Sequence, residues 1–375
     1  MHSDINSVCQ DLDIDFYHDS IITSHETRIE NGEVVWLDLS GCNIQSLPSN
    51  AFAEMSSLQR LNLSLNSIRT IHPSAFAGLQ HLKQLNLAHN GLRTLSERLL
   101  TDLTELQYLS LRSNQLDSLD DDLLTHNHSL QELDLINNNL ETISPTLSSL
   151  KSLQVLYLAR NNLTVVDQQL AGMPCLEVLD LKINNLISID PQSFSELPNL
   201  LLLHLGHNMI EELPQGVFEG LSGLLSLFLN TNQLTHLDSN IFSPLIRLQE
   251  LCLDRNPLRH LPYLSGLPLE RLQISTMKLE LQDDQFKGLD QLKFLRMREI
   301  SATSLPDDLF HYTPNLRELS LSYNPLTTIP HSLLELEKLP YLTEIALEET
   351  NLGEYAKTFP DRKQIEDFVK SYVSQ

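Results

Sequence analysis

The sequence predicts an α/β solenoid: a curved array in which short parallel strands form a concave sheet and irregular or short-helical segments form the convex side. Two observations predict it. The spacing Leu–x–x–Leu–x–Leu–x–x–Asn–x–Leu recurs at steps of about 24 residues along nearly the whole chain. A repeat this short cannot bury its own apolar face, so successive copies must stack into one continuous core. The periodicity therefore indicates one elongated domain, although 375 residues would ordinarily suggest two or three.

Fourteen copies can be counted from the first apolar position of each. They begin at Val34, Leu58, Leu82, Leu106, Leu130, Leu153, Leu176, Leu200, Leu224, Leu248, Leu269, Leu292, Leu316 and Leu342. Each copy is predicted to open with a short strand. Two leucines, such as Leu61 and Leu63, point into the core, and the residue between them points to the concave side.

An asparagine three residues beyond the second strand leucine has a structural purpose. Where the chain turns out of the strand, backbone N–H and C=O groups are buried without sheet partners. An amide side chain donates and accepts hydrogen bonds at once, so stacked asparagines can satisfy these groups as a ladder. The rungs are Cys42 in the first copy and then Asn66, Asn90, Asn114, Asn138, Asn161, Asn184, Asn208, Asn232, Asn256 and Asn324.

These residues resemble the leucine-rich repeat family over approximately residues 34–352, and the resemblance implies a horseshoe-shaped solenoid. A phenylalanine also precedes the next repeat in many copies, at Phe52, Phe76, Phe194, Phe218, Phe242, Phe286 and Phe310. With Leu47-Pro48 and Leu213-Pro214, this pattern is similar to the "typical" subfamily, found mainly in receptor ectodomains and in secreted matrix or immune proteins. The resemblance implies a protein-recognition module without enzymatic activity, and leaves its partner unnamed.

Caps are expected at both ends of the array because a solenoid otherwise leaves its core open. The predicted division is an N-terminal cap at 1–33, a solenoid at 34–352 and a C-terminal helical cap at 353–375. Residues 11–16 alternate polar and apolar side chains, as a half-buried capping strand would. Near the C-terminus, apolar residues at helical spacing follow Asp361, which fits a capping box with Gln364.

Copies eleven and twelve depart from the pattern. Met277 and Ile300 occupy the asparagine rung, and the spacing from Leu248 to Leu269 shrinks to 21 residues. Neither side chain can bond the buried backbone, so we expect a locally altered turn or a bend there. The alternative is drift in a tolerant repeat.

The predicted binding face changes character along the chain. Between the strand leucines, polar residues in the first five copies give way to Tyr157, Asp180, His204, Phe228 and Cys252. Aromatic side chains on an exposed face gain from losing water contact when a partner covers them. The predicted ligand-binding residues are Tyr108, Tyr157, Arg160, Lys182, His204 and Phe228. The alternative is that some of them pack on one another across adjacent strands. A basic stretch at Arg271, Arg296 and Arg298 is interpreted as solvated charge.

Charge and motifs restrict the function further. The formal net charge of −24 repels phosphate backbones, so nucleic acid is not expected as a partner. No apolar run is long enough to cross a membrane, and the first ten residues lack the pattern of a signal peptide. No nucleotide-binding, metal-binding or catalytic motif occurs, so neither a cofactor nor an enzyme is predicted. The oligomeric state stays open.

The four cysteines bear on the compartment. Cys175 and Cys252 are too far apart to pair, whereas Cys9 could pair with Cys42 if the N-terminal cap folds over the first rung. The leading hypothesis is an extracellular protein, secreted or an ectodomain, in innate immunity, receptor signalling or matrix adhesion. The alternative is a cytoplasmic interaction scaffold, regulator or bacterial effector without a catalytic domain, which the few cysteines favour.

Overall fold

The computed structural model describes residues 27–170 and 172–374. The chain falls into two compact units, each of which is described by itself. Unit 1 comprises residues 1–185 and 196–200, and unit 2 comprises residues 186–195 and 201–375. Both are α/β solenoids with a parallel sheet and little helix, as the periodicity predicts.

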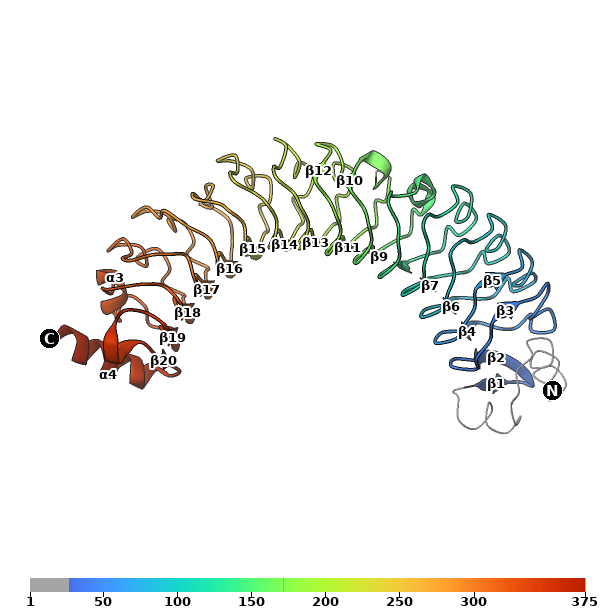
Figure 1. Cartoon of the computed structure of the whole chain (residues 1–375), viewed down its shortest axis with the longest axis horizontal. Coiled ribbons are helices and arrows are strands. Elements are labelled where there is room, and N and C mark those ends of the chain that lie inside the picture. The colour runs from blue at the N-terminus through green and yellow to red at the C-terminus, as the bar shows by residue number, and fades with distance from the viewer. Residues whose placement is uncertain (1–26, 171, 375) are drawn as a thin grey trace. The chain divides into compact units, whose positions relative to one another are not determined.

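The sheet of unit 1 begins with an antiparallel pair and continues with parallel strands in chain order (Figure 1). Its strands are β1 (Arg28–Glu30), β2 (Glu33–Asp38), β4 (Arg60–Asn62), β6 (Gln84–Asn86), β7 (Tyr108–Ser110), β8 (Glu132–Asp134), β9 (Val155–Tyr157) and β11 (Val178–Asp180). The opposite side carries β3 (Ser46–Leu47), β5 (Thr70–Ile71), β10 (Val165–Val166) and two 3₁₀ turns, η1 (Pro145–Ser149) and η2 (Gln168–Leu170). Asn31 and Gly32 turn β1 back onto β2 with φ angles of 50° and 90°, so β1 covers the first edge of the parallel strands.

Unit 2 repeats the same arrangement and ends with an antiparallel strand. Its sheet contains β13 (Leu202–His204), β14 (Ser226–Phe228), β15 (Glu250–Cys252), β16 (Arg271–Gln273), β17 (Phe294–Arg296), β18 (Glu318–Ser320), β19 (Glu344–Ala346) and β20 (Thr358–Phe359). Its other elements are β12 (Ser188–Ile189), α3 (His331–Leu334), the 3₁₀ turn η3 (Gly353–Tyr355) and α4 (Arg362–Val373). Each of the fourteen predicted copies therefore contributes one strand to a parallel sheet, seven in each unit.

The core consists of the residues that the repeat pattern marks as apolar. Leu61 and Leu63 are buried, and the recurring spacing places their equivalents from every copy in the same layer. The seven repeat phenylalanines are also buried, and Phe52 stacks on Phe76 with ring centroids 6.0 Å apart. In the three-residue strands the first and third residues lie on the other side, as Trp36 and Asp38 do in β2, and they form what we call the exposed sheet face.

The asparagine ladder forms as predicted. Asn138 Oδ1 accepts a hydrogen bond from the Leu116 N–H at 3.1 Å, and its Nδ2 donates to the carbonyls of Leu111 and Leu135 at 3.0 and 3.1 Å. The Leu111 carbonyl also accepts from Asn114, at 3.0 Å. Each rung thus ties its own turn to the preceding one, and neighbouring rungs share carbonyls.

The residue before each rung adopts the left-handed conformation. The φ angle is 57° at Leu65, 57° at Arg160, 54° at Ile183 and 55° at Glu299, although none of these residues is glycine. This backbone conformation costs an L-residue about 1–2 kcal/mol. After Leu65, Arg160 and Ile183 the rung is an asparagine, and its side chain holds the turn in place through several hydrogen bonds.

Copies eleven and twelve lack the amide rung but keep the sheet. Leu251, Leu272 and Leu295 pair in unbroken parallel register through β15, β16 and β17. Other side chains link these copies: Asp254 Oδ1 accepts from the Ser275 N–H at 2.5 Å, and Ser275 Oγ accepts from the Arg298 N–H at 3.2 Å.

A locally altered turn is found in copy twelve. Ser301 adds a second left-handed residue with a φ of 61°, and the N–H groups of Ile300 and Ala302 both donate to Asn324 Oδ1. The predicted bend stays a prediction.

Helix α4 covers the last strands of unit 2. Asp361 caps it, accepting from the Gln364 N–H at 2.9 Å and from the Gln364 side chain at 2.7 Å. In a standard capping box the second bond would reach the N-cap N–H instead. Ile365 and Phe368 are buried, and Phe368 stacks on Phe359 of β20 at 4.6 Å. No helix in the described part of the chain is long and apolar enough to cross a bilayer.

The expected capping strand at residues 11–16 and Cys9 lie outside the described residues. Cys175 and Cys252 are both free thiols, as predicted. The sequence contains three Asn-x-Ser/Thr sites, at Asn62, Asn127 and Asn162. Asn127 is fully buried and donates to the carbonyls of Leu100 and Leu103, so it cannot carry a glycan in the folded chain.

Candidate functional site

Two predicted tyrosines lie on the exposed sheet face of unit 1. Tyr108 is the first residue of β7 and pairs in register with Glu132 of β8, whereas Tyr157 is the last residue of β9 and pairs with Asp134. Strand β8 separates them, so the structure places both tyrosines around its two carboxylates. Both rings are half-buried. Burial raises the pKa of each hydroxyl, and the Glu132 and Asp134 charges raise both further.

The carboxylates between the tyrosines are partly withdrawn from water. Burial raises the pKa of both Asp134 and Glu132, and the Asp134 charge raises that of Glu132 further. Arg112 lies 3.9 Å from Asp134, which favours the ionised form. This part of unit 1 is aromatic and acidic, a combination that suits a cationic side chain of a partner.

Lys182 and Arg160, the predicted cations of the site, differ in their surroundings. Lys182 Nζ forms an ion pair with Asp180 at 3.2 Å, because these residues project from the same side of the chain around β11. Arg160 is exposed but lies in the left-handed turn beyond β9 rather than in the strand. The structure therefore brings Lys182 onto the face with Tyr157, and places Arg160 at its margin.

His204 and Phe228 form a stacked pair on the exposed sheet face of unit 2. They pair in register on β13 and β14, and their rings lie 4.8 Å apart with an interplanar angle of 26°. The expectation that some site residues pack on one another across strands is met here. A Cβ at position 206 would lie 2.8 Å from His204 and 2.5 Å from the Asn230 side chain, so a larger residue there would displace one of these side chains. Cys252 follows Phe228 in the same register, and burial raises the pKa of its thiol to about 12.

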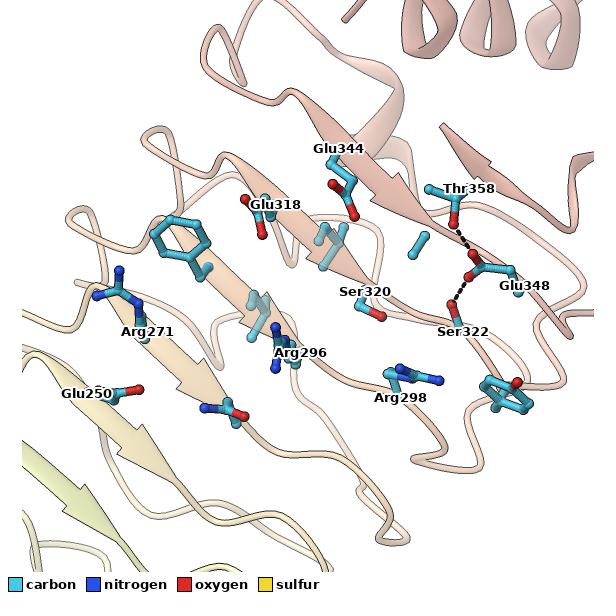
Figure 2. A pocket seen from close by; sticks show the side chains of 16 residues that line it. Glu250, Arg271, Arg296, Arg298, Glu318, Ser320, Ser322, Glu344, Glu348 and Thr358 are labelled. Carbon is cyan, nitrogen blue, oxygen red and sulfur yellow. Dashed lines mark hydrogen bonds between the residues drawn. The ribbon is translucent and has the colours of Figure 1, made fainter. Parts of the chain in front are cut away.

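A pocket of about 630 Å³ lies further along the exposed sheet face of unit 2 (Figure 2). Arg271, Arg296 and Arg298, interpreted from sequence as solvated charge, all line it. Its other charged residues are Glu250, Glu318, Glu344 and Glu348. The sequence shows these arginines only as a basic stretch, because they come from two copies and line one pocket only when β16 and β17 pair. The signal for their proximity is that Arg271 and Arg296 lie within the strands of adjacent copies.

The lining of this pocket suits binding of charged groups. Two hydroxyls fix one carboxylate: Ser322 Oγ and Thr358 Oγ1 each donate to Glu348 (Figure 2). The guanidinium groups of Arg271 and Arg298 lie over aromatic rings, 4.7 Å from the Phe294 centroid and 5.1 Å from that of Tyr323. Elsewhere, in unit 1, the carboxylates of Glu97, Asp120 and Asp122 converge on the surface, and nothing else there points to a bound cation.

Comparison with known proteins agrees with this architecture. A family model described as leucine rich repeat matches residues 33–92, 66–116, 104–163, 151–210, 202–258 and 299–343, more than half of the chain. The unmatched stretch between residues 258 and 299 contains Met277, one of the positions where the amide rung is missing. No curated protein matches the sequence at a significant level.

Several solved structures are similar. TLR13 in its complex with ssRNA13 is 28% identical with a TM-score of 0.73, over 85% of this chain and 51% of TLR13, so the chain spans about half the length of that protein. A leucine-rich repeat protein of Leptospira interrogans is 27% identical with a TM-score of 0.72, over 95% of this chain and 96% of its own. The leucine-rich repeat domain of APL1B is 26% identical with a TM-score of 0.64, over 77% and 83%.

Proposed function

Because the chain belongs to the leucine-rich repeat family, whose proteins serve as interaction modules, we propose that it is a non-enzymatic recognition protein. It binds a protein partner through the exposed sheet faces of its units. Tyr108, Tyr157 and Lys182 contribute in unit 1 with Arg160 at the margin, and His204 and Phe228 contribute in unit 2.

The observation that carries this proposal is the aromatic content of the exposed sheet faces. Tyr157 and Phe228 occupy the third strand position, where earlier copies have Asn62, Asn86 or Ser110. Polar residues would serve a solvated sheet equally well. Rigid aromatic side chains are typical of the residues that contribute most to binding between proteins, since they bury a large area at low entropic cost.

The setting that we propose is extracellular, in innate immunity, receptor signalling or matrix adhesion. The phenylalanine-containing repeats support it, as does the similarity to TLR13 and APL1B. Although the TLR13 structure contains an RNA, the net charge of −24 and the carboxylates around the tyrosines oppose a nucleic-acid partner for this chain. Membrane insertion is not part of the proposal.

A second candidate is an intracellular interaction scaffold. The C-terminal cap favours it, because α4 contains no cysteine and is held by Phe359, Phe368 and its capping bonds. A thiol count on the denatured protein separates the two settings: four free thiols indicate a reducing compartment, whereas a Cys9–Cys42 disulfide indicates an oxidising one.

The binding face can be tested with single substitutions in the full chain. Partners are captured with the intact protein, and each purified partner is then measured against Tyr157→Ser and Phe228→Ser. Both rings are half-buried, so the variants are expected to fold, and the loss of an interface aromatic weakens binding by about 30-fold or more. Tyr341→Ser is the matched control, because Tyr341 is 55% exposed and lies outside the sheet strands. Unchanged affinity in both face variants would refute the proposal.

A further inference from the structure

In the part of the chain that the structure describes, the arginines of the unit 2 pocket form no close ion pair, although the charge of Arg296 acts on the nearby carboxylate of Asp254. Among the described residues, no carboxylate oxygen lies within 4.0 Å of the guanidinium nitrogens of Arg271, Arg296 or Arg298. The adjacent Lys293, by contrast, pairs with Glu270 at 2.7 Å. In a chain with 49 acidic and 25 basic residues, three arginines in one pocket concentrate positive charge on a small area.

Neighbouring rings hold two of these arginines in place. The Arg271 guanidinium lies over Phe294 and that of Arg298 over Tyr323. A guanidinium stacked on a ring keeps its N–H groups at the edge, where they can donate to an incoming oxygen. Arg296 lies on β17 between them in chain order, and Figure 2 shows its side chain between those of Arg271 and Arg298. These guanidinium groups are therefore largely ordered before a ligand binds, so binding loses less side-chain entropy.

The carboxylates of the pocket are arranged on either side of the arginines. Register places Glu250, Arg271, Phe294, Glu318 and Glu344 in one row across β15 to β19. Glu250 and Glu318 have no ion pair among the described residues, while the hydroxyls of Ser322 and Thr358 bind Glu348. The pocket thus offers a basic centre between two acidic margins.

We propose that this pocket binds a short acidic segment of a protein partner. Carboxylates of the segment accept hydrogen bonds from Arg271, Arg296 and Arg298, and basic side chains beside them face Glu250 and Glu318. A volume of about 630 Å³ accommodates a few side chains. The acidic margins would repel the continuous phosphate charge of a nucleic acid, which favours a peptide with charges of both signs. This inference rests on the proposed function, because it names the kind of partner segment that one unit recognises.

The test uses the full chain and a random dodecapeptide display library as the probe. Peptides retained by the wild-type protein should be enriched in Asp or Glu, with Lys or Arg nearby. Binding of individual peptides, measured by fluorescence polarisation, should weaken about 10- to 100-fold in Arg296→Ala, since bonds to charged groups are lost. Arg296→Lys should bind these peptides more tightly than Arg296→Ala but less tightly than the wild type, because lysine keeps the charge without the planar set of guanidinium N–H donors. Binding should also weaken as NaCl is raised.

Arg247→Ala is the matched control, since Arg247 is an exposed arginine of unit 2 outside the pocket. The arginines of the pocket are also exposed, so their variants should keep the unfolding midpoint of the wild type. Peptides without acidic enrichment, or with equal affinity for Arg296→Ala, would overturn the inference but leave the proposed function standing. Failure to retain any peptide would also overturn it, and partner capture with Tyr157→Ser would still decide the proposed function separately. Tighter, arginine-dependent binding of a single-stranded oligonucleotide would overturn it in favour of a nucleic-acid ligand.

Discussion

Replacing Asn138 by leucine tests the asparagine ladder directly. Three hydrogen bonds disappear, but their losses differ. The Leu116 N–H loses its amide acceptor, whereas the carbonyls of Leu111 and Leu135 keep second donors, Asn114 at 3.0 Å and Asn161 at 2.9 Å. An orphaned buried N–H costs about 1–3 kcal/mol and each lost shared bond about 0.5–1.5 kcal/mol, against about 1 kcal/mol gained from apolar burial. We expect the free energy of unfolding to fall by about 3 kcal/mol.

Urea unfolding provides the measurement. The single tryptophan, Trp36, lies on β2 in the same unit as Asn138, so its fluorescence reports the unfolding of unit 1. The matched control is Asn139→Ala, because Asn139 is exposed and its side chain makes only long hydrogen bonds, both 3.4 Å. The control should change stability by less than about 0.5 kcal/mol.

The double variant Asn114→Leu/Asn138→Leu sharpens the test. It removes both donors to the Leu111 carbonyl, so its loss should exceed the sum of the single losses by about 1 kcal/mol. A pair of distant rungs, Asn66 and Asn138, should be additive. The reasoning fails if Asn138→Leu behaves like the Asn139 control, or if both double variants are equally additive.

Three further predictions concern the turns and the titratable groups. Leu65 has a left-handed backbone and is 62% exposed. Glycine adopts this conformation without strain, so the free energy of unfolding of Leu65→Gly should be about 0.5–1 kcal/mol higher than that of Leu65→Ala. Equal stability of the two variants would argue against backbone strain at this position. Burial raises the pKa of Asp254 in the folded state above its value of about 4 in the unfolded chain. The folded state therefore holds this proton more tightly, and the free energy of unfolding falls as the pH rises from about 4 through the raised pKa. The free energy of unfolding of Asp254→Asn should equal that of the wild type below this pH range and exceed it at neutral pH. Identical pH profiles of unfolding free energy for the two proteins would contradict this. Iodoacetamide mapped by mass spectrometry should label exposed Cys175 at pH 8 and leave Cys252, with its pKa of about 12, unmodified until urea is added; rapid labelling of Cys252 would refute its burial.

The sequence predicts most of this fold because every copy must bury the same strand leucines and satisfy the same buried backbone groups in its turn. The leucine spacing determines which strand residues are buried. In most copies an asparagine such as Asn138 hydrogen-bonds the backbone groups that the turn leaves without partners. Ser301 was not predictable in this way, because its left-handed φ arises where Ile300 replaces the amide and the chain rearranges around Asn324.

The candidate sites depended on information that spacing alone does not contain. The stack of His204 on Phe228 follows from strand register, which the repeat does predict. The ion pair between Lys182 and Asp180 depends on side-chain conformation, and the left-handed turn at Arg160 moves that residue off the strand. The arginine pocket emerged only from pairing β16 with β17, since Arg271 and Arg296 are far apart in the sequence.

The missing asparagines in the turns after β16 and β17 affect where local unfolding of unit 2 begins. In a linear array each turn is stabilised by its neighbours, so unfolding begins where the coupling between neighbours is weakest. Without amides at Met277 and Ile300, β16 depends on strand pairing, apolar packing and the bonds of Asp254 and Ser275. Local opening there would detach Arg271 from its neighbours while His204 and Phe228 stay ordered. Amide exchange would therefore divide unit 2 into segments of different protection, and the charge on Asp254 would make that division depend on pH.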